Sequence, residues 1–307
     1  MQRRIYFSSS ILCITLKLPL FLQLEMPNVM NISVAHIRRT LQESYSAQEA
    51  ANLSRIVCCE ILGQTAVDYY LGKDIILSPK EMQDLDGILA RLHNFEPIQY
   101  IQGTARFLER SYHVAPGVLI PRPERRNWME TMLKEIASDA RVLDIGTGSG
   151  CIAVSLSKAF PDAKVTAWDI SDEALNIARR NNDMLGGNVR FLRQNVLTYT
   201  PGDSECYDVI VSNPPYVTES EKQTMERNVL DWEPFSALFV PDNDPLLFYR
   251  RIAELGKTML APGGRLYFEI NRAYGEATAT MLCEQGYTNL RVLKDISGND
   301  RIVIAER

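Results

Sequence analysis

Apolar and polar positions follow two different periods along the C-terminal part of the chain. Short apolar runs, typical of buried strands, alternate with stretches that carry a helical apolar stripe. The predicted strands are 141–145, 164–169, 189–195, 207–212 and 265–270, the predicted helices are 151–160, 172–185 and 244–260, and 290–294 is expected to pair with 301–305. Strands that alternate with helices are typical of a doubly wound α/β fold, in which ligands bind at the carboxyl ends of parallel strands.

Residues 31–96 show a different pattern and are predicted to be all-helical. Two segments, Ser46-Ala-Gln-Glu49 and Ser78-Pro-Lys-Glu81, have the spacing of a helix capping box, and Gly63 is expected to close the first helix. The helix after Ser78 carries one apolar stripe, so the region is predicted to form a small bundle. Such a bundle can be a scaffold or a platform for a protein substrate, and composition does not decide between the two.

Residues 97–123 are predicted to link this bundle to a larger domain at 124–307. Positions 106–114 alternate between apolar and polar in a strand-like way. Pro116-Gly117 is expected to turn the chain into a second strand at 118–120, which gives a hairpin.

The first residues differ from the rest of the chain. The stretch before Leu24 has basic but no acidic residues, and Lys17 and Pro19 interrupt its apolar run, so it is too broken to span a membrane. We interpret residues 1–30 as a leader that is either disordered or a mis-assigned start, because Met30 offers a later start. A targeting role for this leader is the alternative.

Composition narrows the class of protein. The 307 residues are 46% apolar and 23% charged, as in a soluble globular protein. The net charge of −5 argues against a broad electrostatic grip on nucleic acid. None of the six cysteines forms a C-x-x-C pair and the three histidines are scattered, so we expect no metal site and a reducing, cytoplasmic setting.

A glycine-rich loop follows the predicted strand 141–145. Its pattern, Gly146-Thr-Gly-Ser-Gly150, is G-x-G-x-G and not the G-x-G-x-x-G of dinucleotide-binding folds. Asp144 precedes the loop, and an acidic residue there would repel a pyrophosphate but suits a cationic ligand that carries an ammonium and a sulfonium. Asp169 ends the next strand, 23 positions beyond Gly146, near the spacing of about 20 for a ribose-binding carboxylate.

The four residues Asn213-Pro214-Pro215-Tyr216 follow the strand 207–212 and carry the most specific chemistry. Neither proline has an N–H, so two consecutive peptide units offer carbonyl acceptors only. Asn213 adds a side-chain amide oxygen, and Tyr216 adds a flat face for stacking. The segment is therefore suited to hold a planar NH2 group with both hydrogens engaged and its nitrogen directed at an electrophile.

These motifs resemble those of a known family. The loop with its strand resembles motif I of the class I S-adenosylmethionine methyltransferases, and Asn-Pro-Pro-Tyr resembles their amino-group-methylating motif. A closer resemblance, from about residue 31 onward, is to the peptide-chain release factor glutamine methyltransferases, on the segments Pro97-Ile-Gln-Tyr-Ile-Gln-Gly103, Leu119-Ile-Pro-Arg-Pro-Glu124, and Glu233-Pro234 with Ala237-Leu238. The chain departs from the family after Glu124, where Arg125-Arg126 stand in place of Thr-Glu.

The resemblance implies a Rossmann-like seven-stranded methyltransferase sheet behind a small N-terminal helical domain that recognises the substrate. It implies methyl transfer from S-adenosylmethionine to the glutamine of the Gly-Gly-Gln motif in class 1 release factors, with Asn213 and Pro214 as catalytic residues. The substrate would be held by Asn213, Pro214, Pro215 and Tyr216. The cofactor set implied is Asp144, Gly146, Thr147, Gly148, Ser149, Gly150, Asp169, Asn195 near the adenine, and Asn213.

Two other functions compete with this one. An amino-group methyltransferase acting on adenine or guanine in nucleic acid could use the same Asn-Pro-Pro-Tyr segment. A cofactor-binding module without activity is the third, and the intact segment argues against it. The acidic charge, the absence of a recognisable nucleic-acid-recognition domain and the Glu233-Pro234 segment favour the protein methyltransferase. We expect a monomer that has no stable nucleic-acid or membrane partner.

Overall fold

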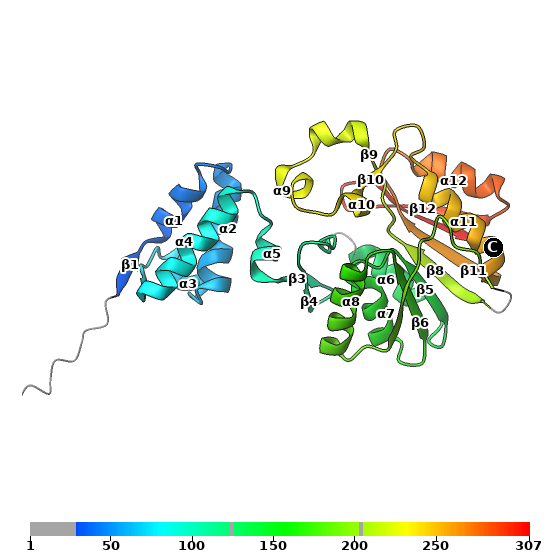
Figure 1. The fold of residues 1–307 in the computed structure, drawn as a ribbon, viewed down its shortest axis with the longest axis horizontal. Coiled ribbons are helices and arrows are strands. Elements are labelled where there is room, and N and C mark those ends of the chain that lie inside the picture. Colours follow the sequence, from blue (N-terminus) through cyan, green and yellow to red (C-terminus); the bar gives the residue numbers. More distant parts are fainter. Residues whose placement is uncertain (1–28, 123–125, 203–204) are drawn as a thin grey trace, which may run out of the picture.

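The computed structural model describes residues 29–122, 126–202 and 205–307. A large α/β unit and a smaller helical unit stand side by side, joined by the short helix α5 (Figure 1). In the described part of the chain, no helix is long and apolar enough to cross a membrane.

The α/β unit is built on one seven-stranded sheet, in the order β12-β13-β11-β8-β5-β6-β7. Its strands are β5 (Arg141–Ile145), β6 (Lys164–Asp169), β7 (Val189–Arg193), β8 (Tyr207–Ser212), β11 (Leu260–Glu269), β12 (Thr288–Lys294) and β13 (Asp300–Glu306). The five strands from β11 to β7 run parallel, and β13 runs antiparallel to both of its neighbours. This order confirms the doubly wound, Rossmann-like sheet that the sequence predicts.

Helices cover both faces of the sheet (Figure 1). They are α6 (Arg126–Glu135), α7 (Cys151–Ala159), α8 (Asp172–Leu185), α11 (Leu247–Met259) and α12 (Gly275–Glu284). Consecutive strand residues face opposite sides: Val142 packs with α6 and α7, whereas Leu143 packs with α11 and α12. The sheet is therefore buried on both faces, which is why its strands read as continuous apolar runs.

Several predicted boundaries in this unit differ from those in the structure. The fifth strand, predicted from Arg265, begins at Leu260. The helix expected from Asp244 begins at Leu247, because Pro245 biases the residue before it away from helical geometry. The third strand ends at Arg193, two positions before the predicted end at Asn195. The Asn195 side chain accepts a hydrogen bond from the Leu197 N–H and so begins a turn.

The N-terminal unit contains α1 (Val34–Leu41), α2 (Ala47–Ile56), the π-helix η1 (Val57–Ile61), α3 (Ala66–Tyr70) and α4 (Pro79–His93). Ser78 and Glu81 form the predicted capping box of α4. The Ser46 hydroxyl caps α2 by accepting a hydrogen bond from the Glu49 N–H. This bond is one of the two that make up the predicted capping box.

The expectation that residues 31–96 are all-helical is wrong. Strand β1 (Met30–Ile32) pairs antiparallel with β2 (Ile75–Leu77) at the end of the bundle (Figure 1). Ile32, Ile75 and Leu77 are buried in the same apolar cluster as the helices, so this ribbon closes the small core.

The linker consists of α5 (Ile98–Gln102) and a hairpin of β3 (Thr104–Phe107) and β4 (Arg110–His113). A hairpin is confirmed, but the predicted position of its turn is wrong. The hairpin turns at Leu108 and Glu109, both with positive φ (46° and 60°). The chain does turn at Pro116-Gly117, as predicted, but this turn lies after the hairpin. Residues 118–120 form no strand, although Val118 and Ile120 are buried against α8.

A further excursion follows β8. It contains β9 (Val217–Thr218), the 3-10 helix η3 (Glu219–Thr224), α9 (Arg227–Leu230), α10 (Phe235–Leu238) and β10 (Phe239–Val240), which pairs parallel with β9. This excursion reaches toward the N-terminal unit (Figure 1). The Arg227 guanidinium lies 4.2 Å from the Phe95 ring centre, and Trp232 Nε1 donates to the Asn94 carbonyl at 3.0 Å.

Candidate active site

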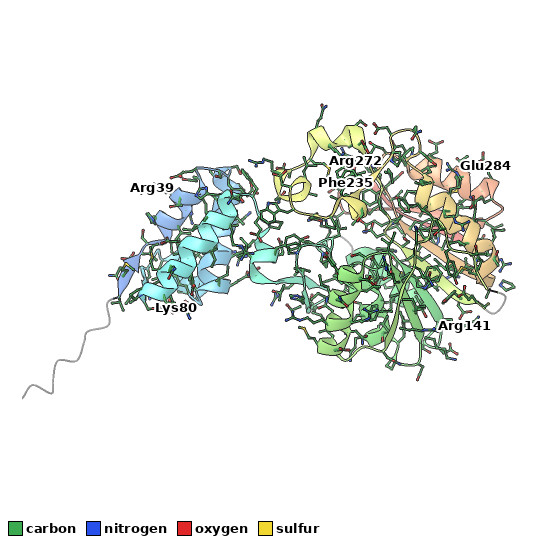
Figure 2. All side chains as sticks on the ribbon, in the orientation of Figure 1. Arg39, Lys80, Arg141, Phe235, Arg272 and Glu284 are labelled. Atoms are coloured by element: carbon green, nitrogen blue, oxygen red, sulfur yellow. The ribbon has the colours of Figure 1, made fainter. Side chains whose placement is uncertain are left out.

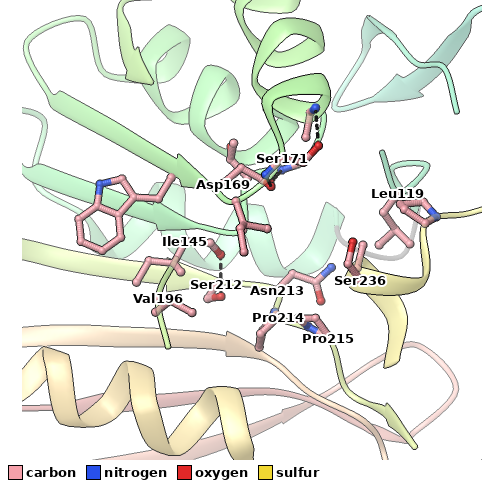
Figure 3. A pocket seen from close by; sticks show the side chains of 18 of the residues that line it. Leu119, Ile145, Asp169, Ser171, Val196, Ser212, Asn213, Pro214, Pro215 and Ser236 are labelled. Carbon is pink, nitrogen blue, oxygen red and sulfur yellow. Dashed lines mark hydrogen bonds between the residues drawn. The ribbon is translucent and has the colours of Figure 1, made fainter. Parts of the chain in front are cut away.

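The carboxyl ends of β5, β6 and β8 meet at one cavity of about 340 Å³, which we call the large cavity (Figure 3). Most of the sequence-predicted site residues line it: Gly146, Thr147, Gly148, Ser149, Asp169, Asn195, Asn213, Pro214 and Pro215. The loops that follow parallel strands converge at one edge of the sheet, so residues far apart in the chain come together here.

The glycine loop brings bare backbone to this cavity. Gly146 and Gly148 have positive φ (75° and 55°), a region that glycine enters without strain. A Cβ at Gly148 would meet no other atom within 4 Å, so the loop faces open space at that point. The Gly146 and Thr147 N–H groups both donate to the Trp168 carbonyl at 2.9 Å, which fixes the loop against the end of β6.

Asp144 and Gly150 lie behind the loop and are not among the residues that line the large cavity. The Asp144 side chain is fully buried and accepts a hydrogen bond from Thr147 Oγ1 at 2.7 Å. Gly150 has φ 79°, and a Cβ there would lie 3.0 Å from the Ala178 Cβ. In the structure, Asp144 therefore braces the loop, and Gly150 allows α7 and α8 to approach closely.

Asp169 is held in place by the backbone around it. Its two carboxylate oxygens accept the Gly148 N–H at 2.9 Å and the Ser171 N–H at 3.0 Å. Burial raises the pKa of the Asp169 carboxyl above its ordinary value, and backbone hydrogen bonds from Ser171, Gly148 and Ile170 oppose this shift. A carboxylate has about four acceptor positions, so at least one remains for a ribose hydroxyl.

Apolar side chains beyond Asp169 extend the large cavity. Ile170 and Leu197 line it although they are 51% and 37% exposed, and Asn195 lies beside Leu197. Two exposed apolar side chains at one cavity suit the flat faces of an adenine. The sequence analysis missed both residues. Their position in the sequence could have identified them as cavity residues. Ile170 and Leu197 each follow, within two residues, a polar residue predicted to end a strand.

Asn213 lies where the large cavity meets a smaller one of about 50 Å³, the small cavity. Its side-chain oxygen Oδ1 is buried and accepts no hydrogen bond from the described residues. Ser212, the residue before it, donates to the Ile145 carbonyl at 2.7 Å and so holds β8 against β5 (Figure 3). A buried acceptor that lacks a partner in the protein is costly, unless a ligand supplies the donor.

Tyr216 lines the small cavity and not the large one. Its hydroxyl donates to Glu269 Oε1 at 3.3 Å, and its backbone N–H donates to the Leu238 carbonyl at 3.2 Å. The Tyr216 ring packs against the core between the sheet and α11. These contacts fix the course of the chain after Pro215.

Residues from two distant segments complete the small cavity. Leu119 and Arg122 come from the linker, and Ala237 and Leu238 come from α10. Ser236 lies beside the Asn213 side chain, and Leu119 lies beyond Ser236 on the same side (Figure 3). The sequence analysis quoted both segments for their resemblance but did not predict that they meet.

The groups that line the large cavity fit the parts of S-adenosylmethionine. Asp169 can accept from the ribose hydroxyls, Ile170 and Leu197 can cover the adenine, and the bare backbone at Gly148 leaves room for the amino-acid part. Within the described ranges, no group of three or more His, Cys, Asp or Glu side chains could hold a metal ion. The fold and the site together define a class I, S-adenosylmethionine-dependent methyltransferase.

Comparisons with known proteins extend this assignment. The family model described as "Methyltransferase small domain" matches residues 127–231, and "PrmC N-terminal domain" matches residues 34–103. The release factor glutamine methyltransferase of Bacteroides thetaiotaomicron is 57% identical over 278 residues, which is 91% of this chain and 100% of that protein. The protein of the same name from Flavobacterium psychrophilum is 43% identical over 77% of this chain and 85% of its own length.

A solved methyltransferase structure from Pyrococcus furiosus is 21% identical and matches 72% of this chain and 98% of its own, with a TM-score of 0.50. That likeness shows a shared fold. The identities to the curated relatives go further, and the chain belongs to the release factor glutamine methyltransferase family.

Proposed function

We propose that this protein transfers the methyl group of S-adenosylmethionine to the side-chain amide nitrogen of the glutamine in the Gly-Gly-Gln motif of class 1 peptide-chain release factors. The observation that carries the proposal is Asn213 Oδ1, a buried acceptor that receives no hydrogen bond from the described residues, at the junction of two cavities. The names of the curated relatives identify the substrate class. The protein would act as a cytoplasmic monomer in support of translation termination.

Each cavity would hold one reactant. When bound in the large cavity, S-adenosylmethionine supplies a methyl group on a positively charged sulfur. A glutamine side chain that reaches from the small cavity to the junction at Asn213 would donate one amide hydrogen to Asn213 Oδ1. It would donate the other to the carbonyl of Pro214, which lines the large cavity. Because both hydrogens are then engaged, the nitrogen is held toward the large cavity for in-line attack.

The main contribution of these residues is orientation. An amide nitrogen is a poor nucleophile because its lone pair is delocalised, and acceptors on its hydrogens stabilise the positive charge that develops during attack. The proton becomes acidic once nitrogen bonds to the methyl group, so no strong general base has to act beforehand. The apolar walls of the two cavities exclude water from the reacting atoms.

The small cavity favours an amide over a nucleobase. Its volume of about 50 Å³ corresponds to only a few water-sized groups, at roughly 10–15 Å³ each, which suits a carboxamide better than a purine ring. A base in a duplex must also be flipped out of the stack, usually with help from a basic channel, and this chain has a net charge of −5.

We also propose residues 31–96 as the platform for the release factor, 97–123 as the linker and 124–307 as the methyltransferase domain.

Labelled cofactor tests this function directly. The enzyme is incubated separately with a class 1 release factor, with its Gly-Gly-Gln variant in which the glutamine is replaced by alanine, and with DNA. We expect label in the first protein and background label in the other two samples. Label in the DNA, or undiminished label in the alanine variant, would overturn the proposal.

A further inference from the structure

An ion pair joins the two distant segments that wall the small cavity. Arg122 Nη2 lies 2.5 Å from Glu233 Oε1, although the two residues are 111 positions apart. The Glu233 side chain is 1% exposed and that of Arg122 is 34% exposed. A charged hydrogen bond to such a buried carboxylate is short, strong and directional.

The linker side of this ion pair is held in place by its own contacts. The Tyr100 hydroxyl donates to the Val118 carbonyl at 2.6 Å, and Val118 and Ile120 are buried. Leu119, between these two buried residues, lines both cavities. Arg122, three positions after Leu119, lines the small cavity and not the large one.

The Glu233 side is held by its neighbours in the chain. Trp232 Nε1 donates a hydrogen bond to the Asn94 carbonyl of the N-terminal unit, and Pro234 and Phe235 line the large cavity. Ala237, in the α10 helix that follows, lines both cavities. The ion pair therefore joins the segment that carries Leu119 to the segment that carries Ala237, and both residues line the two cavities together with Asn213.

We propose that Arg122 is a positioning residue for the substrate amide that accepts the methyl group. Its ion pair with Glu233 holds the small cavity at the width of a side-chain amide. This inference rests on the proposed function. Without the guanidinium, the buried Glu233 carboxylate would lose a charged partner and would attract water to the wall of the cavity. The amide would then rotate away from the line of attack, and a misplacement of about 1 Å can cost on the order of a hundredfold in rate.

The experiment compares Arg122→Met with Arg122→Lys and with a matched control. Arg141→Met removes a similarly exposed arginine from another carboxylate pair, with Asp208, at the amino end of β5. Figure 2 shows Arg141 on the side of the α/β unit far from Phe235. For each variant, kcat and KM are measured with the release factor, cofactor affinity by calorimetry, and folding by thermal unfolding.

We expect Arg122→Met to lower kcat by roughly a hundredfold. Its cofactor affinity should change by less than about threefold, because Arg122 does not line the large cavity. Arg122→Lys, which keeps the charge, should recover part of the rate, and Arg141→Met should stay within about threefold of the unaltered enzyme. If Arg122→Met does not fold, Glu233→Gln, which keeps a hydrogen-bond acceptor of the same shape, is expected to show the same loss of kcat.

Three results would overturn the inference: full activity of Arg122→Met, an equal loss in Arg141→Met, or parallel losses of kcat, cofactor affinity and thermal stability, as a purely structural role would give. The unaltered enzyme separates this inference from the proposed function. If the unaltered enzyme does not label the release factor, the proposed function fails. If it does, and Arg122→Met labels the protein equally well, only the role of Arg122 fails.

Discussion

Asp169 provides the sharpest test of the cofactor site. The Gly148, Ile170 and Ser171 N–H groups all donate to its carboxylate, which leaves at least one acceptor position for a ribose hydroxyl. A hydrogen bond to a charged group contributes roughly 1.5–3 kcal/mol. Asp169→Ala should therefore weaken S-adenosylmethionine binding about 10- to 150-fold for each ribose bond lost.

Two comparisons separate the ribose contacts from the support that Asp169 gives to the loop. Asp169→Asn keeps an acceptor oxygen, so we expect a smaller loss of affinity than in the alanine variant. Calorimetry with S-adenosylmethionine measures the affinity, and thermal unfolding without cofactor measures the effect on the loop. An unchanged affinity in Asp169→Ala would remove the residue from the site.

The affinity should also depend on pH. Burial raises the pKa of the Asp169 carboxyl in the free protein, and hydroxyl donors in the complex would favour the ionised form and lower that pKa. Binding is then at full strength above the free-protein pKa and weakens as the pH falls through it, by up to about tenfold per unit. Asp169→Asn should lack this dependence, and the same acid-side loss in that variant would assign it to another group.

Three other predictions concern the reaction, the start of the chain and the loop. Asn213→Ala should lower turnover by roughly a hundredfold and leave calorimetric cofactor affinity nearly unchanged; equal losses in both would contradict a substrate-facing role. A chain that begins at Met30 should fold and keep full activity by the labelling assay, and precipitation or inactivity would make residues 1–29 structural. Gly150→Ala should lower the free energy of unfolding by about 2 kcal/mol, because φ is 79° and the new Cβ would lie 3.0 Å from that of Ala178; unchanged thermal unfolding would refute this.

Residues at strand ends could be placed from the sequence because local signals mark them. Asp169 and Asn213 each end an apolar run, and the carboxyl ends of neighbouring parallel strands meet at one edge whatever the loops do. No local pattern in the sequence indicates that Arg122 pairs with Glu233. The two residues are 111 positions apart, and only the folded chain brings them together.

The hairpin turn and the small ribbon were missed for local reasons. Leu108 and Glu109 adopt positive φ without being glycine, whereas Pro116-Gly117 has the composition of a turn. Strands β1 and β2 each have three residues, too few to show an alternating pattern between helical stretches. The ribbon is buried in the core of the N-terminal unit and the hairpin packs against the core of the α/β unit, and composition alone does not report such contacts.

The strand order also has a consequence for synthesis of the protein. Strand β13, at residues 300–306, lies between β12 and β11, so the sheet around β11 cannot close until nearly all of the chain has left the ribosome. The apolar core of the N-terminal unit is made by residues between Ile32 and Ile101, so it can form much earlier. A nascent chain would thus carry a finished helical unit while the edge of β11 that receives β13 is still open. During that interval the edge is exposed to other chains.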